Sequence, residues 1–219
     1  TSQMLNPMTG DLDAEILEAL GIPREKFGVM TQPGTVAGTL TEQVQEATGL
    51  GAVPVIAVAG HDTGSAVAAV PAKDKEYAYL SCGTWSLLGI ESETAIITED
   101  SFRENFTNEG GIEGTTRFLK NICGLWLFEQ SRKKFKDAPS SVGELVALCE
   151  ESSYEGLIFP DDPSFANPPS MTAAIREYCS RTGQPAPETP ADYCRCIFRS
   201  LAFRYRQVVE ILGGMCSFP

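Results

Sequence analysis

A short polar cluster directly follows a continuous apolar stretch of the sequence. Residues 53–59 read Val-Pro-Val-Ile-Ala-Val-Ala, and after one glycine the chain continues with His61, Asp62 and Thr63. A carboxylate held at the end of a strand suits the task of a general base, which takes the proton from an attacking hydroxyl in phosphoryl transfer. Asp62 also has a structural interpretation, because an aspartate just before a helix caps free backbone N–H groups. His61, the single histidine of the chain, likewise suits either a structural or a functional role.

A second polar cluster follows the next strand-like run. Residues 77–82 alternate as in a strand, and Gly83 and Thr84 come directly after them. A glycine turn offers backbone N–H groups and threonine adds a hydroxyl, so the pair suits phosphate oxygens. A plain turn between two strands has the same composition. Together, a carboxylate at one strand end and hydrogen-bond donors at another favour phosphoryl transfer.

The elements that position these clusters follow from hydrophobic periodicity. Residues 53–59 are continuously apolar and rich in β-branched side chains, which predicts a strand buried on both faces. The small residues of 63–70 predict a tightly packed helix that Pro71 ends. A charged turn at 73–76 comes next, and after it a meander of short strands begins. We therefore place a domain boundary between residues 71 and 72.

The rest of the chain combines strands and helices. Further strands are predicted at residues 36–40, 77–82, 85–91, 95–97 and 156–160, with consecutive strands inside 102–118 and a hairpin turn at 108–111. Helices are predicted at residues 12–20, 41–48, 122–135, 141–150, 171–181 and 190–212. In the last helix we expect the buried side to hold Ile197, Leu201, Phe203, Val208, Val209 and Leu212, and the solvated side to hold Arg199, Arg204 and Arg206.

Two further polar positions have both a structural and a functional interpretation. Asn121 opens the predicted helix 122–135, where asparagine caps the N-terminus. A side-chain amide at a helix start can also contact a ligand, so the two roles do not exclude each other. The pair Asp161-Asp162 resembles a metal site only superficially, because Pro163 and the loop setting predict solvated turn residues.

Composition narrows the classes of partner. The chain has 219 residues, of which 42% are hydrophobic, and this suffices for a hydrophobic core. The formal net charge is -12 and the pI is near 4.6, so the negatively charged surface should repel nucleic acid and anionic membranes. The sequence has no run of 18 apolar residues and no charged and then apolar leader, so we expect a cytoplasmic protein without a membrane span or signal peptide.

The seven cysteines are an odd number in a chain too large to need disulfide bonds for folding, so free thiols are expected. Cys194-Arg195-Cys196 lacks the second pair of ligands that a zinc site needs, and no metal site is predicted. A disulfide from Cys179 to Cys194 or Cys196 requires that the two predicted helices lie side by side, and this pairing stays open.

The stretch AVAGHDTGSAVAAVPAKDKEYAYLSCGTWSLLGIE, residues 57–91, resembles the centre of the FGGY carbohydrate kinases. Within it, GHDT at 60–63 and SCGTWSLL at 81–88 are similar to those FGGY kinases that phosphorylate L-rhamnulose. Residues 5–23 and 121–127 agree with the resemblance, which therefore runs through nearly the whole chain.

The resemblance implies an α/β fold of the ribonuclease H-like, actin-like ATPase kind. Residues 1–71 would form the C-terminal part of the first FGGY kinase domain and residues 72–219 the N-terminal part of the second, with the active-site cleft between them. It also implies ATP and Mg²⁺ as cofactors and L-rhamnulose as the sugar, phosphorylated at its C1 hydroxyl. The alternatives are another FGGY sugar or polyol kinase and a noncatalytic sugar-binding module with the same fold.

The same resemblance assigns a role to each candidate residue. The sugar-binding residues would be His61, Asp62, Thr63 and Asn121, and the ATP-binding residues would be Gly83, Thr84 and Glu129. Asp62 would deprotonate the sugar hydroxyl, while the Gly83-Thr84 turn holds the γ-phosphate as charge develops. Glu129 takes a position associated with the nucleotide, where the family often has glutamine.

Two features of the family are missing, and they predict an internal fragment. FGGY kinases are longer than this chain and begin with a strand and an acidic Gly-Thr phosphate loop, which nothing before Gly60 resembles. They also carry a Gly-rich adenine-binding turn after the long helix, whereas this chain stops at residues 213–219. We therefore expect the chain alone to be inactive and to self-associate through strand 53–59, which lacks sheet neighbours.

Overall fold

The computed structural model describes residues 2–74, 76–135, 138–139 and 141–216, which divide into two compact units. Unit 1 comprises residues 1–79 and 89–119, and unit 2 comprises residues 80–88 and 120–218. The division cuts through one β-sheet, so three of its strands contribute residues to both units.

Unit 1 contains most of the short elements of the chain. They are α1 (Ala14–Leu20), η1 (Arg24–Lys26), β1 (Val36–Thr39), α2 (Glu42–Thr48), β2 (Pro54–Ile56), α3 (Asp62–Ala68), α4 (Glu99–Arg103) and β5 (Phe106–Gly110). The Asp13 carboxylate accepts a hydrogen bond from the Ile16 N–H at the start of α1, and Gly21 ends this helix in the left-handed conformation, with a φ of 64°. Gly49 ends α2 in the same way. Both helices confirm the predictions.

The shared sheet has the strand order β3-β4-β6-β5, where β3 is Ala78–Cys82, β4 is Trp85–Ser92 and β6 is Thr116–Cys123. β3 and β4 confirm the predicted strands 77–82 and 85–91. In unit 1 the rings of Phe106 and Phe118 stack with their centroids 4.9 Å apart. Gly89 lies so close to Phe118 that a Cβ atom at position 89 would collide with the Phe118 carbonyl. Strands β4 and β6 are therefore closely packed in this region.

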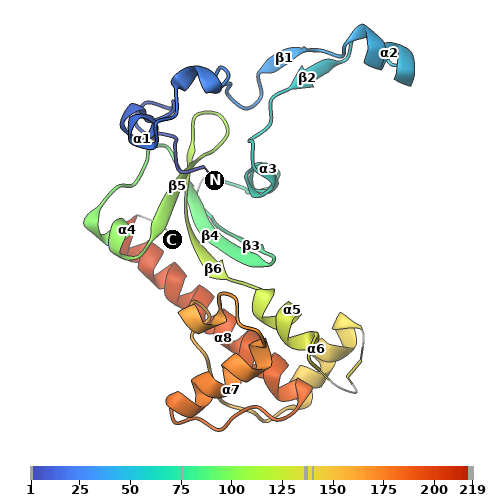
Figure 1. The fold of residues 1–219 in the computed structure, drawn as a ribbon, viewed down its shortest axis with the longest axis vertical. Helices are drawn as coiled ribbons and strands as arrows, with labels where there is room; N and C mark the ends of the chain where they lie inside the picture. Colours follow the sequence, from blue (N-terminus) through green and yellow to red (C-terminus); the bar gives the residue numbers. More distant parts are fainter. Residues whose placement is uncertain (1, 75, 136–137, 140, 217–219) are drawn as a thin grey trace. The chain divides into compact units, whose positions relative to one another are not determined.

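β1 and β2 form a two-stranded antiparallel arm, with α2 between them in sequence and near its end (Figure 1). The prediction of a buried strand at 53–59 is wrong here. β2 has three residues, and Val55 and Ile56 are 44% and 46% exposed. The reason is that β1 is the only strand that pairs with β2 among the described residues, and within them no second layer covers the arm's apolar side chains.

The predicted strand at residues 95–97 is also wrong, because a side chain takes the place of a neighbouring strand. The Asn108 side-chain amide accepts a hydrogen bond from the Ile96 N–H (2.9 Å) and donates one to the Ile96 carbonyl (3.0 Å). Both backbone groups of Ile96 are thus satisfied without a strand partner.

The stretch 102–118 differs from the predicted run of strands at its beginning and at its turn. It begins inside α4, which is capped by a reciprocal pair of hydrogen bonds between Thr98 and Ser101. The hairpin turn between β5 and β6 lies at 111–115 rather than 108–111, and the Gly111 N–H donates to the Thr115 carbonyl at 2.8 Å.

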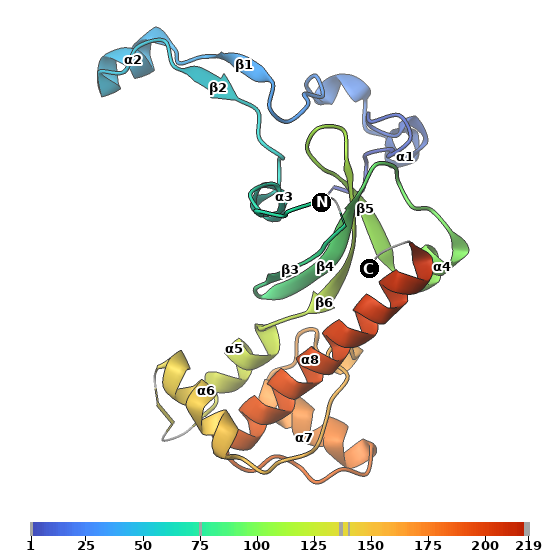
Figure 2. The same ribbon diagram turned by 180° about the vertical axis from the view of Figure 1, so that it is seen from behind.

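Unit 2 is mainly helical and has a continuous core. Its helices are α5 (Trp126–Arg132), α6 (Val142–Glu151), η2 (Pro163–Phe165), α7 (Met171–Arg181) and α8 (Pro190–Met215). Figure 2 shows α8 as the long helix of this unit, with α5, α6 and α7 packed beside it. The core holds Cys123, Leu127, Phe128, Leu145, Ile158, Phe165, Met171, Ile175, Cys179, Tyr193, Cys194, Cys196, Ile197 and Leu201. Helices α6, α7 and α8 confirm the predictions.

Two element predictions in unit 2 are wrong. The helix expected at 122–135 starts later, because β6 continues through Cys123 and α5 begins at Trp126. Residues 156–160 form no strand. The Gln184 side-chain amide accepts from the Leu157 N–H and donates to the Leu157 carbonyl, both at 2.8 Å, so this segment is held by a side chain as well.

The expected faces of α8 are correct in part. Ile197, Leu201, Val208 and Leu212 are buried, but Phe203 and Val209 are 51% and 38% exposed. Arg204, expected in solvent, is buried because its Nε lies 2.8 Å from Asp161 Oδ2. Asp161 also accepts a hydrogen bond from the Cys123 N–H at 2.8 Å. Asp161 is therefore the partner of a buried charge rather than a solvated turn residue.

All seven cysteines are free thiols, so Cys179 pairs with neither Cys194 nor Cys196. Burial raises the pKa of the Cys123 thiol to about 11, and burial raises the pKa of the Cys194 and Cys196 thiols to about 12. These thiols are accordingly neutral groups in an apolar core. In the described part of the chain, no helix is both long and apolar enough to span a membrane.

Candidate active site

Asp62 stands at the start of α3, but it does not cap that helix. His61 is the N-cap residue, and Asp62 is the first helical residue. The Asp62 carboxylate accepts a hydrogen bond from the adjacent Thr63 N–H at 2.8 Å, and its side chain is 94% exposed in this chain. The structural interpretation of Asp62 as an N-cap is therefore wrong.

The two oxygens of the Asp62 carboxylate have different surroundings. Oδ1 lies 2.8 Å from the Thr63 backbone nitrogen and 3.1 Å from His61 Nε2. Among the described residues, no backbone nitrogen or basic side chain contacts Oδ2 in this way. A carboxylate that is oriented through one oxygen and open at the other can accept a proton from a hydroxyl placed beside it.

The Gly83-Thr84 turn, which belongs to unit 2, is held through its backbone. The Gly83 and Thr84 carbonyls accept hydrogen bonds from the Leu125 N–H (2.8 Å) and the Trp126 N–H (3.1 Å), while the Gly83 N–H donates to the Trp85 carbonyl (3.0 Å). The turn thus supplies partners for free N–H groups at the start of α5. The side chain of Thr84 is left exposed, where its hydroxyl can reach a ligand.

Gly124 and Ser86 fix this turn by close packing. A Cβ atom at position 124 would lie 2.6 Å from the Gly83 carbonyl oxygen and 2.6 Å from Ser86 Oγ, so glycine is required there. The fully buried Ser86 hydroxyl lies 2.7 Å from the Tyr205 hydroxyl on α8. Burial raises the pKa of Tyr205 to about 12, so this phenol is neutral at ordinary pH.

Asn121 does not open a helix. It lies in β6 with its side chain exposed, between the buried residues Lys120 and Ile122. The prediction that Asn121 caps a helix is wrong, because α5 begins five residues further on, at Trp126. Its exposed amide is free to face a ligand, and its contact with a sugar stays a prediction.

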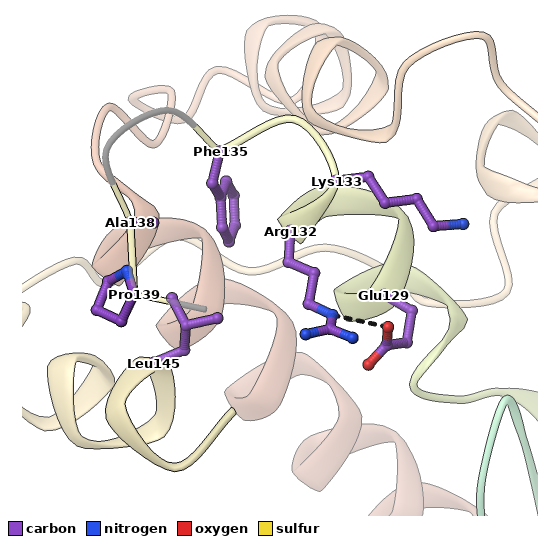
Figure 3. Close-up of a pocket in the computed structure, with 7 residues that line it drawn as sticks. All are labelled: Glu129, Arg132, Lys133, Phe135, Ala138, Pro139 and Leu145. Carbon is purple, nitrogen blue, oxygen red and sulfur yellow. Dashed lines mark hydrogen bonds and ion pairs between the residues drawn. The ribbon is translucent and has the colours of Figure 1, made fainter. Parts of the chain in front are cut away.

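Glu129 lies on α5 at the edge of a pocket of about 310 Å³. The pocket is lined by Glu129, Arg132, Lys133, Phe135, Ala138, Pro139 and Leu145 (Figure 3). Arg132 Nε lies 2.8 Å from Glu129 Oε2, so the carboxylate has a counter-charge one turn along the helix. With Arg132 and Lys133 beside it, an acidic residue at this position does not make the pocket anionic.

The structure therefore gathers the predicted residues into two groups. His61, Asp62 and Thr63 belong to unit 1, whereas Gly83, Thr84, Asn121 and Glu129 belong to unit 2. No set of three or more His, Cys, Asp or Glu side chains among the described residues is arranged to hold a metal ion. A Mg²⁺ ion would therefore depend on substrate phosphates and water for most of its ligands.

The sequence did not single out two charged residues near His61. Glu109 Oε2 lies 3.6 Å from His61 Nδ1, and Arg117 Nη2 lies 2.8 Å from the same Glu109 oxygen. The available signal was the pair of glycines at 110 and 111, since a hairpin near them places residues of β5 opposite residues of β6.

Comparison with known proteins identifies the family. Residues 1–69 match the N-terminal domain of the FGGY family of carbohydrate kinases, and residues 78–215 match the C-terminal domain of this family. The chain belongs to the FGGY family of carbohydrate kinases. The two matched ranges are separated by residues 70–77, whereas the compact units divide within the sheet. The domain boundary at 71 and 72 stays a prediction.

Relatives within the FGGY family include rhamnulokinases. The rhamnulokinase of Bacteroides thetaiotaomicron is 55% identical over 220 residues, which cover 100% of this chain and 45% of that protein. The rhamnulokinase of Pectobacterium atrosepticum is 44% identical over 221 residues, covering 100% of this chain and 43% of that protein. This FGGY chain thus spans less than half the length of the curated relatives it matches.

Solved structures of FGGY kinases share the fold. The xylulose kinase of Rhodospirillum rubrum superimposes with a TM-score of 0.66 at 18% identity, over 99% of this chain and 43% of that one. A ligand-bound xylulose kinase of Lactobacillus acidophilus gives a TM-score of 0.66 at 15% identity, over 95% of this chain and 42% of that one. The predicted α/β fold of the ribonuclease H-like, actin-like kind is confirmed.

Proposed function

We propose that this chain forms part of a sugar kinase that transfers the γ-phosphoryl group of ATP to the C1 hydroxyl of L-rhamnulose. The observation that carries the proposal is the Asp62 carboxylate at the start of α3, with Oδ1 held by Thr63 and His61 and Oδ2 open. The likeness to rhamnulokinases over the full chain supports the choice of sugar.

Each candidate residue has a task in this reaction. Asp62 takes the proton from the attacking hydroxyl through Oδ2, while His61, Thr63 and Asn121 bind the sugar. The Gly83-Thr84 turn offers the Thr84 hydroxyl to the γ-phosphate oxygens, where negative charge develops. This turn can hold the phosphate in place because its carbonyls are tied to the start of α5.

ATP and Mg²⁺ enter the proposal in different ways. The pocket beside Glu129, with Arg132 and Lys133 on its rim, is a candidate contact for the nucleotide. Mg²⁺ in kinase sites is held largely by substrate phosphates and water. Since the described residues form no site for this ion on their own, no step of the reaction is assigned to it.

Replacement of the proposed base tests the function. In the protein at its full length, Asp62→Asn should lower kcat for L-rhamnulose about 10²- to 10⁴-fold, the usual contribution of a positioned general base. The melting temperature should stay the same, because the amide oxygen of the substituted side chain can still accept from the Thr63 N–H. The matched control is Asp100→Asn, an exposed carboxylate on α4. Near-normal turnover of Asp62→Asn would contradict the proposal.

A substrate panel tests the choice of sugar. A coupled kinase assay over ketoses and polyols should give the highest kcat/KM with L-rhamnulose. If another ketose or a polyol is preferred by tenfold or more, the reaction class stands and the named sugar is wrong. If no sugar supports ATP turnover while sugars still bind, the noncatalytic alternative is correct.

A further inference from the structure

Arg117 carries a charge into the interior of unit 1. Its side chain is 2% exposed, and its Nη2 lies 2.8 Å from Glu109 Oε2. Because the Gly111 N–H bonds to the Thr115 carbonyl in the hairpin turn, counting two residues along each strand brings Glu109 opposite Arg117. A buried guanidinium requires such a counter-charge, since an unpaired charge in the interior is strongly unfavourable.

The same Glu109 oxygen also faces His61. Oε2 lies 3.6 Å from His61 Nδ1, and on the other side of the ring His61 Nε2 lies 3.1 Å from Asp62 Oδ1. The exposed fraction of the side chain rises along this row, from 2% for Arg117 to 15% for Glu109, 27% for His61 and 94% for Asp62. Cationic or imidazole groups thus alternate with carboxylates from the interior to the surface.

The packing of α3 leaves room for this row. Gly64, two residues after Asp62, is buried against Arg117, and a Cβ atom there would lie 2.9 Å from Arg117 Nη2. His61 Nδ1 is also fully buried and has no hydrogen-bond partner among the described residues. Glu109 Oε2 is therefore the charged atom placed to interact with a hydrogen on Nδ1.

We propose that Glu109, held by Arg117, is a positioning residue for Asp62 and acts through the His61 ring. The inference rests on the proposed function in one respect, that Asp62 is the base. When both ring nitrogens of His61 carry a hydrogen, Glu109 attracts the one on Nδ1 and the Nε2–H donates to Asp62 Oδ1, so the ring is fixed between the two carboxylates. This contact, with the Thr63 N–H, holds the carboxylate so that Oδ2 stays open for the hydroxyl proton.

A kinetic test uses Glu109→Gln in the protein at its full length. The amide keeps the shape and can still accept a hydrogen bond from Arg117, but it lacks the charge that attracts His61 and balances Arg117, so the melting temperature should fall together with kcat. We expect kcat to fall about 10- to 100-fold, as for other partners that orient a functional histidine, with the KM for ATP unchanged. The matched control is Glu113→Gln, an exposed glutamate in the same hairpin.

A double-mutant cycle separates positioning from simple support of the fold. If Glu109 acts through the ring, His61→Asn combined with Glu109→Gln should lower kcat no further than His61→Asn alone. If the two losses multiply, or if Glu109→Gln lowers only the melting temperature, the proposal is overturned.

A second readout needs no turnover. In the full-length protein labelled with ¹⁵N-histidine, the imidazole signals of His61 are the ones that disappear in His61→Asn. Glu109→Gln should move the Nδ1 and Nε2 chemical shifts, and Glu113→Gln should leave them unchanged. Unmoved signals in Glu109→Gln would overturn the proposal. If the signals move but Asp62→Asn remains active, the row of contacts exists and it is the assignment of Asp62 as base that fails.

Discussion

The two segments proposed to act on substrate are held by different kinds of contact. The Gly83-Thr84 turn of unit 2 is fixed by neutral backbone hydrogen bonds and by the close approach of Gly124. Asp62 of unit 1 lies at the exposed end of a row of charged or polar groups that begins at the buried Arg117. A change of shape should therefore disturb the turn, and a change of charge should disturb Asp62.

The two units also differ in how completely their side chains are buried. Unit 2 has a continuous core between its helices, whereas the β1-β2 arm of unit 1 exposes every one of its strand residues. The chain contains separate reporters for this difference. Both tryptophans, Trp85 and Trp126, belong to unit 2, and the single histidine belongs to unit 1.

The largest effect is expected at the ion pair between Asp161 and the buried Arg204, where the stability of unit 2 depends on charge. Asp161→Ala removes the partner of the buried Arg204 and the acceptor of the Cys123 N–H. Loss of one partner of a buried ion pair costs about 3–5 kcal/mol, so unit 2 should be destabilised by this amount. Urea unfolding followed by tryptophan fluorescence measures it. The control Glu210→Ala breaks an exposed pair with Arg206 and should change the free energy of unfolding by less than about 0.5 kcal/mol.

The next effect sharpens the contrast between shape and charge. Gly124→Ala adds no charge but places a Cβ against Gly83 and Ser86, so it should destabilise unit 2 by about 1–3 kcal/mol through overpacking. Gly143→Ala is the matched control on the exposed surface of α6, where alanine should stabilise by about 0.5–1 kcal/mol. Equal unfolding midpoints for the two variants would show that the turn is not held by close packing.

A smaller effect is expected at alkaline pH, mainly in unit 2, which contains all seven cysteines. Unit 1 contributes near and above pH 10 through Tyr77, because burial raises the pKa of its phenol to about 12. Burial raises the pKa of the Cys196 thiol from 9.0 to about 12. Below pH 9 the thiol is neutral in both states and stability is constant. Above pH 9 the unfolded chain ionises first, so stability falls as the pH rises toward the folded-state pKa, by about 1 kcal/mol per such thiol near pH 10.

Unfolding midpoints from pH 8 to 10.5 test this dependence, with tryptophan fluorescence as the probe. Cys196→Ala should reduce the fall of stability with rising pH by the contribution of one buried thiol. A midpoint that stays constant up to pH 10.5 is inconsistent with buried neutral thiols in the folded core.

The smallest effect is expected in the arm of unit 1. Val58, two residues beyond the end of β2, is 70% exposed, so Val58→Ser removes almost no buried apolar surface and should change the free energy of unfolding by less than about 0.5 kcal/mol. Hydrogen exchange of the arm amides measures it. A loss above 1 kcal/mol would mean that another surface covers the arm in solution, by self-association for example, and light scattering would then detect the larger species.

Much of the helical structure follows from local sequence signals. Asp13 and Gly21 at the ends of α1, and Thr189 with Asp192 at the start of α8, are capping residues that act on their own helix. Such contacts span a few residues, so a sequence pattern contains them. The polar clusters after the strand-like runs were recognisable for the same reason, since each is contiguous in sequence.

The errors occur where a distant side chain decides the outcome. Asn108 satisfies the backbone of Ile96 across 12 residues, and Arg204 meets Asp161 across 43. Neither partner is marked by periodicity, so a strand was expected at 95–97 and a solvated arginine at 204. Asn121 was placed at a helix start because nothing local shows that β6 continues through Cys123. Glu109 has no local signal in the sequence, because its role depends on its contacts with both Arg117 and His61.

The Gln184 contact has a consequence for how this chain behaves among its copies. Residues 157–159, Leu-Ile-Phe, are uncharged and apolar, and isoleucine and phenylalanine favour strands. The N–H and carbonyl of Leu157 are occupied by the Gln184 amide, and the Ile158 N–H donates to the buried Ser200 hydroxyl at 2.9 Å. An extended strand from another molecule would therefore have to displace these partners before it could pair here. Gln184 and Ser200 thereby occupy backbone groups that a strand from another molecule would need.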